Sequence, residues 1–184
     1  GIANYSREDK KQLHAKNKPY FDRIKGYIDN PASFMAEPFK VLWIWGEDPN
    51  TGHSVIAANI GCALIKKNYK VRYYEMHNLT KLIMEFKDSD VVAEMNRAID
   101  YFDVFIINDA FDRQRSTVSS ANEYLRANVF NFFQQTLSKN KKIIYTSDVD
   151  IIGIGEQYNS IISMVIRSYS EMHICGTLNS LFRK

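Results

Sequence analysis

The sequence predicts a three-layer α/β domain in which helices cover both faces of a five-stranded parallel sheet. Short apolar runs alternate with segments whose apolar residues recur at helical spacing, the pattern of strands joined by crossover helices. The chain has 184 residues, 45% of them hydrophobic, which suits one sizeable core and is too little for two ordinary domains. We therefore expect one doubly wound unit, with ligands at the carboxyl ends of its strands.

The chain is expected to begin with a surface helix. Residues 7–29 place apolar side chains at helical spacing among charged ones, which is typical of an amphipathic helix. Pro31 and Pro38 then interrupt the chain, because proline breaks regular structure. We accordingly divide the chain into an N-terminal helix and connection, residues 1–36, and an α/β core, residues 37–184.

Five apolar runs are expected to form the strands of the core. They span residues 39–45, 70–76, 103–108, 142–145 and 172–175. The first helix between them begins near Ser54, whose side chain can cap it. Further helices are expected over 78–99, as two short ones, over 118–137, and around Ile161, Ile162 and Val165.

The composition excludes several classes of protein. Lys and Arg total 24 against 21 Asp and Glu, for a formal net charge of +3, which is too balanced to indicate a nucleic-acid binder by itself. No run approaches the roughly 20 apolar residues that span a bilayer, and the polar start lacks the apolar core of a signal peptide. We expect a cytoplasmic protein without a membrane partner.

Cysteine and histidine residues show no pattern of metal ligands. Cys62 and Cys175 lie far apart in the sequence, so we expect two buried thiols in a reducing compartment. His14, His77 and His173 share no ligand spacing with each other or with the cysteines. No metal site is predicted from these residues.

The segment WGEDPNTGHS, residues 45–54, lies between the first strand and the first long helix. A nucleotide-binding loop belongs at this place, because amides at a helix N-terminus can bind a phosphate. The usual pattern is Gly, four residues, Gly, Lys and then Ser or Thr, whereas this loop is one residue longer and has histidine in place of lysine. The candidate residues of the loop are Gly46, Asn50, Thr51, Gly52, His53 and Ser54.

The chemistry of this loop is unfavourable for a polyphosphate. A lysine brings a permanent charge on a long stem to the β and γ phosphates. His53 is shorter, and an imidazole does not carry the permanent charge of a lysine. Glu47 and Asp48 add negative charge beside it. ATP and magnesium are therefore doubtful cofactors, and a generic strand-turn-helix connection explains the loop almost as well.

Several motifs follow one another in a recognisable order. After a helix that ends near Asp29 come TGHSVIAANIGCALIKKNYKV, YFDVFIINDAFDRQR, KKIIYTSDVDI and GEQYNSIISMVIRS. From about Asn17 to Gly176 the chain thereby resembles the DnaC, DnaI and IstB group of AAA+ proteins. The resemblance implies a P-loop NTPase fold with an AAA+ core, and an ATP site whose residues can be compared with this sequence.

The resemblance assigns a Walker B strand to the segment that ends at Asn108 and Asp109. In the family this strand supplies an acidic residue that helps to hold magnesium, followed by a second that helps to activate water. Asn108 is neutral and cannot balance a cation as a carboxylate does, while Asp109 stays a candidate base. The sensor position, normally Asn after Thr-Ser, reads Asp148 after Ser147, and the expected arginine falls on Met164, three residues before Arg167.

Basic residues at two places are candidates for binding single-stranded DNA. Arg113 and Arg115 follow the Walker B-like strand, where a loader could face DNA or a neighbouring subunit. Lys139, Lys141 and Lys142 follow a helix that contains Phe130, Phe132 and Phe133, and basic residues beside aromatic ones suit single strands. The structural alternative is that the aromatic side chains pack in the core while the lysines are solvated.

By resemblance, we expect a domain that acts in replication initiation and contacts a replicative helicase or its loader, and single-stranded DNA. Because its ATP-site residues depart from the family pattern, it would be a scaffold rather than an enzyme. One alternative is an active ATP-dependent loader or transposition helper with an unusual site built from His53, Asp109 and Asp148. Another is an inhibitor that mimics a loader. The sequence leaves assembly open, a homo-oligomer included.

Overall fold

The computed structural model describes residues 6–85, 89–109, 123–153 and 165–178. These residues form a five-stranded sheet in the order β2-β3-β4-β1-β5, in which every neighbouring pair is parallel. The strands are β1 (Val41–Trp45), β2 (Val71–Glu75), β3 (Val104–Asn108), β4 (Lys142–Ser147) and β5 (Tyr169–His173). The predicted five-stranded parallel sheet is confirmed.

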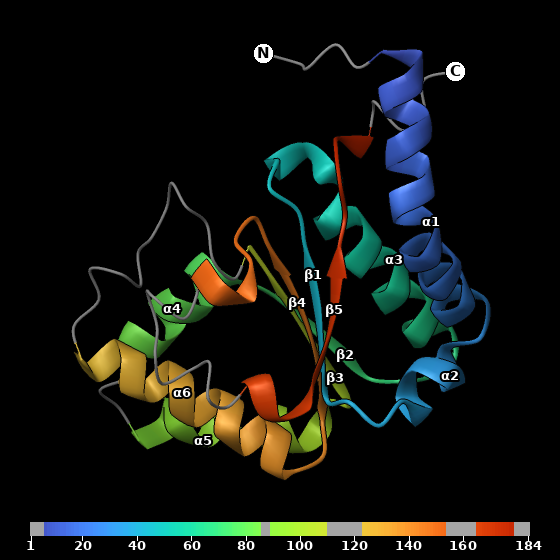
Figure 1. Ribbon diagram of the computed structural model, residues 1–184. Coiled ribbons are helices and arrows are strands. Elements are labelled where there is room, and N and C mark those ends of the chain that lie inside the picture. Colours follow the sequence, from blue (N-terminus) through green and yellow to red (C-terminus); the bar gives the residue numbers. More distant parts are fainter. Residues whose placement is uncertain (1–5, 86–88, 110–122, 154–164, 179–184) are drawn as a thin grey trace.

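Helices cover both faces of this sheet (Figure 1). On one face lie α1 (Arg7–Asp29), α2 (Pro31–Ala36) and α3 (His53–Lys66), and on the other lie α4 (Met76–Glu85), α5 (Ser89–Tyr101) and α6 (Glu123–Ser138). Successive side chains of a strand point to opposite faces, so Leu42 and Ile44 pack toward α3 while Trp43 packs toward α6. Burial on both faces explains why the central strands β1, β3 and β4 are largely apolar, whereas the edge strands β2 and β5 are partly exposed and contain polar residues.

The N-terminal helix α1 is fixed at its start and near its middle. Ser6 and Asp9 form a capping box, in which each side chain accepts a hydrogen bond from the other residue's backbone N–H, an arrangement that satisfies free amides of the first turn. Asn17 is fully buried. Its Nδ2 donates to the carbonyl of Cys175 at 2.7 Å, and its Oδ1 accepts a hydrogen bond from the N–H of Cys175 at 2.8 Å. The helix is thereby joined to the segment that follows β5.

Some expectations need correction. Cys62 is exposed and Cys175 is half-buried, so the prediction of two buried thiols is wrong. Cys62 lies on the outward face of α3, which the sequence pattern does not reveal for a residue as small as cysteine. The expected helix at 118–137 is described from Glu123 onward and ends at Ser138. Ile161 and Ile162 lie outside the described residues.

Two kinds of feature, a membrane-spanning helix and a metal-binding cluster, are absent from the described residues. None of their helices is long and apolar enough to cross a membrane. Within the same residues, no cluster of three or more His, Cys, Asp or Glu side chains could hold a metal ion.

Candidate functional site

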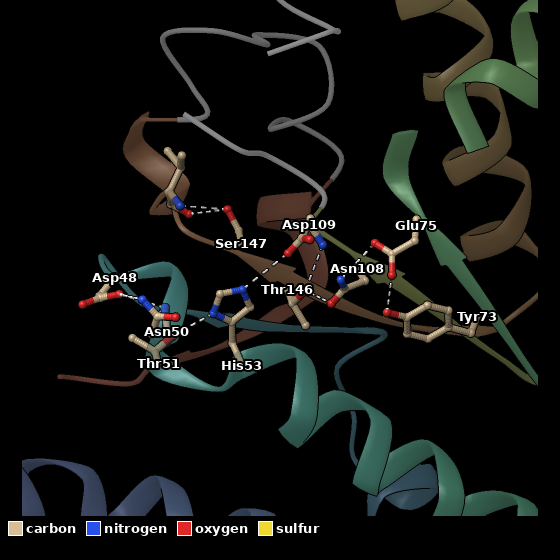
Figure 2. A network of polar contacts seen from close by, with 11 residues as sticks. Asp48, Asn50, Thr51, His53, Tyr73, Glu75, Asn108, Asp109, Thr146 and Ser147 are labelled. Carbon is tan, nitrogen blue, oxygen red and sulfur yellow. Dashed lines mark hydrogen bonds and ion pairs between the residues drawn. The ribbon is translucent and has the colours of Figure 1, made fainter. Parts of the chain in front are cut away.

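The candidate site lies at the carboxyl ends of β1, β3 and β4, where the loop 46–52 leads into α3 (Figure 2). The loop starts beside the end of β4, because the N–H of Gly46 donates to the carbonyl of Ser147 at 3.2 Å. Since all strands are parallel, the side chains that end β2 and β3 reach the same edge. This is the edge at which doubly wound folds bind their ligands.

The loop has a compact conformation that its own residues hold. Asp48 accepts hydrogen bonds through Oδ1 from the N–H of Asn50 at 2.8 Å and from its Nδ2 at 3.1 Å, and so caps a single 3₁₀ turn, η1 (Pro49–Thr51). Gly52 follows with φ of +83°, a left-handed conformation that glycine adopts without steric cost. The side chain of Thr51 packs on Gly46, where a Cβ atom would lie only 2.4 Å from Thr51 Cγ2. The two ends of the loop therefore touch.

His53 occupies the place of the lysine in the usual phosphate-binding loop pattern, and its ring is buried. The residue is 3% exposed. Its Nδ1 lies 2.7 Å from Oγ1 of Thr51, and its Nε2 lies 3.6 Å from Oδ1 of Asp109. The imidazole thus lies between the loop and the end of β3 (Figure 2), with both ring nitrogens facing residues of this chain.

Asn108, the last residue of β3, is 4% exposed, and both ends of its side-chain amide make hydrogen bonds. Its Nδ2 donates to Oε2 of Glu75 at 3.0 Å, and its Oδ1 accepts from Oγ1 of Thr146 at 2.7 Å. The same threonine oxygen accepts the N–H of Asp109 at 3.0 Å. The amide of Asn108 is therefore engaged on both sides and links the ends of β2, β3 and β4.

Glu75 is the residue of this network that sequence reasoning missed. It ends β2, and besides Asn108 it accepts the hydroxyl of Tyr73 through Oε1 at 2.6 Å. Burial, and then the hydrogen bond to Glu75, raise the pKa of Tyr73 above its ordinary value. An acidic residue at the end of a predicted strand was the available signal, because the ends of parallel strands lie at one edge of the sheet. A carboxylate at position 108 would face the carboxylate of Glu75.

Asp109 is the exposed acidic group of the site. Its side chain is 54% exposed, and its φ of +47° is left-handed, a conformation that few non-glycine residues adopt, although Asp tolerates it. Unusual backbone conformations of this kind concentrate at functional sites. Asp109 thus keeps a solvent-accessible carboxylate beside His53.

The sensor-like residues are only partly brought to the site. Ser147 is buried, and its Oγ accepts the N–H of Val149 at 2.9 Å, while Asp148 follows it at the end of β4. Arg167 lies in the short helix η2 (Ile166–Ser168) before β5. Because Tyr169 pairs with Val41, Arg167 is at the amino end of the sheet, roughly 20 Å from the loop at about 3.3 Å per residue. The expectation that Arg167 approaches this site is therefore corrected.

The lysine cluster proposed for DNA lies at the amino edge of the sheet, opposite the loop, and its side chains are engaged. Lys139 pairs with Oδ1 of Asp100 at 2.5 Å, and Lys141 donates to the carbonyl of Asp100 at 3.2 Å. Lys142 is 6% exposed, and its Nζ donates to the carbonyls of Glu37 and Phe39, each at 2.6 Å. Burial lowers the pKa of Lys142, and the nearby charge of Glu37 opposes this.

Lys142 is thus a structural residue, and its assignment to DNA binding is wrong. The sequence could not separate it from Lys141, because the backbone pairing that buries it comes from distant segments. Phe132 and Phe133 are buried in the core, in line with the structural alternative. Arg113 and Arg115 lie outside the described residues.

Neither a family model nor a curated protein sequence matches the chain. Solved structures do match. The DnaC helicase loader superposes with a TM-score of 0.65 at 13% identity, over 85% of this chain and 89% of that chain. DnaI gives a TM-score of 0.63 at 18% identity, over 87% and 82%. The replication initiator DnaA bound to AMPPCP and single-stranded DNA gives 0.68 at 17% identity, over 86% of this chain but only 46% of its own.

The chain therefore spans about half the length of two DnaA structures that it matches, and most of the length of DnaC and DnaI. At these identities the likeness establishes the fold. The domain has a P-loop NTPase-like α/β fold that it shares with the DnaC and DnaI structures, and the predicted resemblance to that group is confirmed at the level of the fold.

Proposed function

We propose that this chain acts in replication initiation as a helicase-loader-like AAA+ domain that serves as a scaffold and does not hydrolyse ATP. The observation that carries the proposal is His53. At the position of the phosphate-binding lysine, the chain has a buried ring whose nitrogens face Thr51 and Asp109. A nucleotide would find no free ammonium group there.

A second departure supports the same conclusion. Asn108 has no charge to balance magnesium, and its amide is engaged with Glu75 and Thr146. A Cβ atom added to Gly52 would lie 3.0 Å from the side chain of Leu178. Leu178 therefore packs against the turn that precedes α3. Loss of a single preorganised donor costs roughly 10²–10³ in rate. Such losses do not simply add, but together they leave little hydrolysis to expect. These residues do not fit a magnesium nucleotide.

The partners follow from the fold relationship. One matching structure is described as a helicase loader, and another contains single-stranded DNA. We infer a replicative helicase or its loader as the protein partner, in the cytoplasm, and single-stranded DNA as a second partner. Because Lys142 is buried and bonded to backbone carbonyls, we assign the DNA contact to Arg113 and Arg115, with Lys139 and Lys141 as further candidates. Self-association into a homo-oligomer is part of the same proposal.

Calorimetric titration with ATP and with a non-hydrolysable analogue, each with magnesium and at several pH values, tests the nucleotide part. We expect neither heat nor thermal stabilisation at millimolar nucleotide, with a loader that has an intact site as the positive control. Heat or thermal stabilisation with either nucleotide, at any of these pH values, would contradict the proposal. It would favour an active loader controlled by nucleotide.

Size-exclusion chromatography with the replicative helicase and with its loader tests the partner part. We expect a complex that forms equally well with and without ATP. The double variant Arg113→Ala, Arg115→Ala should weaken binding to single-stranded DNA while leaving that complex intact. Tight binding to the loader alone, with no affinity for DNA, would instead indicate an inhibitor that mimics a loader.

A further inference from the structure

The two edge strands of the sheet, β5 and β2, differ in what lies beside them. Along β5, α1 supplies contacts, since Arg23 Nη1 donates to Oγ of Ser170 at 2.8 Å, and Asn17 pairs with the segment that follows. Strand β2 pairs with β3 on one side, and no other described strand lies beside it. Arg72 and Tyr73 of β2 are exposed. An edge of this kind presents unpaired backbone N–H and C=O groups.

A cleft lies beside this free edge, between β2 and the helices α4 and α5. Its volume is about 440 Å³, which lies within the range of about 300–1,000 Å³ that ligand pockets occupy. Its walls are largely aromatic on one side, with Tyr74, Tyr101 and Phe102, and two arginines, Arg72 and Arg97, line it as well. The cleft is distinct from the loop site, since its residues come from the opposite face of the sheet.

The charge of the cleft favours an acidic ligand. The guanidinium of Arg72 lies 5.0 Å from the ring centre of Tyr74 and 5.8 Å from that of Phe102, and within the described residues it makes no ion pair. Arg97 is exposed, and Glu94 is the one carboxylate among the described lining residues. A guanidinium held over aromatic rings keeps its outer N–H groups free for a carboxylate.

We propose that an extended acidic segment of a partner protein adds to the free edge of β2 and places side chains in this cleft. In an added strand, alternate side chains lie on one face of the sheet. One acidic side chain would meet Arg72 and Arg97, and a side chain two positions away, aromatic or aliphatic, would pack on Tyr74 and Phe102. Backbone pairing supplies affinity in this mode, and the pocket supplies specificity. The inference does not depend on what the loop binds.

Selection of random hexapeptides against the full chain tests the proposal. Enriched peptides should carry Asp or Glu two positions from an aromatic or large aliphatic residue. The double variant Arg72→Glu, Arg97→Glu should bind them at least about tenfold more weakly, since each charge-assisted contact is lost and a repulsion replaces it. The matched control Arg7→Glu, Lys10→Glu makes the same change of net charge on α1 and should bind normally. Equal thermal unfolding of the two variants checks their folding.

Two N-methylated versions of an enriched peptide test strand addition itself. One carries methyl groups on the amides of its odd positions and the other on those of its even positions. Only one set of amides faces β2, so one version should lose binding and the other should keep it. The proposal is overturned if selection yields no acidic and apolar pair, if both methylated peptides bind, or if binding survives the charge reversal. Full displacement by oligothymidylate would also overturn it, because the occupant would then be nucleic acid.

Discussion

The loop end of the sheet and the cleft beside β2 both place polar side chains at the boundary of the core, but they differ in what those side chains contact. At the loop end, Thr51 contacts His53, and Asn108 bonds to Glu75 and Thr146. In the cleft, the guanidinium of Arg72 has aromatic rings beneath it and no carboxylate partner within the described residues.

This difference separates two roles of polar groups. Groups that bond to one another inside a protein rigidify it and specify one structure, so changes at the loop end should reduce stability. Exposed charges without partners contribute little to folding, so changes in the cleft should alter binding and change stability little.

The largest effect is expected from Gly46→Ala. The new Cβ would lie 2.4 Å from Thr51 Cγ2 and 2.7 Å from the carbonyl oxygen of Ile174, and the backbone oxygen cannot rotate away. We expect a loss of about 3 kcal/mol in the free energy of unfolding, at the upper end of overpacking costs. Urea unfolding measures it.

Gly26→Ala is the matched control, because no atom lies within 4 Å of its added Cβ in the last turn of α1. This variant should be stabilised by about 0.5–1 kcal/mol, as for alanine in a helix interior. Equal stabilities of the two variants would mean that the loop is looser than its contacts indicate.

Asn108→Asp should be next in size. It removes the donor to Glu75 and sets two carboxylates together in a buried place, which costs about 2 kcal/mol near pH 7. One carboxyl of the pair would have its pKa raised in the folded state. Between its unfolded and its folded pKa, the folded protein binds more protons than the unfolded chain, so stability falls as the pH rises from the first value to the second. The deficit should vanish below about pH 4, where both groups are protonated in either state.

The second variant Glu75→Gln, added to Asn108→Asp, should recover most of the loss at pH 7, because an amide can donate to the new carboxylate. Urea unfolding over a range of pH measures both. If Asn108→Asp is as stable as the wild type at pH 7, then Glu75 does not disfavour a carboxylate at position 108, and this prediction is wrong.

Thr51→Val tests a single contact of the loop. It removes the hydroxyl that contacts His53 Nδ1, and we expect a loss of about 1 kcal/mol, typical of one hydrogen bond. Thr136→Val is the control, because the equally buried Thr136 donates only to the carbonyl of Phe132 within its own helix. That bond contributes little to the stability of a helix. A similar loss of stability in both variants would therefore mean that the loop contact has no special role.

The smallest effect is expected from Arg72→Ala combined with Arg97→Ala. Thermal and urea unfolding should show a loss of about 0.5 kcal/mol, the lower end for an exposed cation–π contact, because Arg72 loses its contacts with Tyr74 and Phe102. A larger loss would show that the arginines stabilise the fold, and would remove the contrast between the cleft and the loop end.

Much of the fold could be predicted because parallel strands buried on both faces must be apolar throughout. The run Val104–Asn108 is the clearest case, and its end also located Asn108 and Asp109. The loop 46–52 could be located because its polar residues and late glycine lie between an apolar strand and a helical segment. Glu75, Lys142 and Arg167 were missed or misplaced, because their neighbours come from strands far away in the sequence.

By itself, the sequence determined the order of strands and helices, the position of the loop and the replacement of lysine by His53, since these depend on local pattern and residue type. Only the tertiary structure decided what each polar side chain meets. The parallel register brings Glu75 beside Asn108 and carries Arg167 to the opposite end of the sheet. It also leaves β2 at an open edge, because hydrogen bonding between strands sets these neighbours and no local pattern records it.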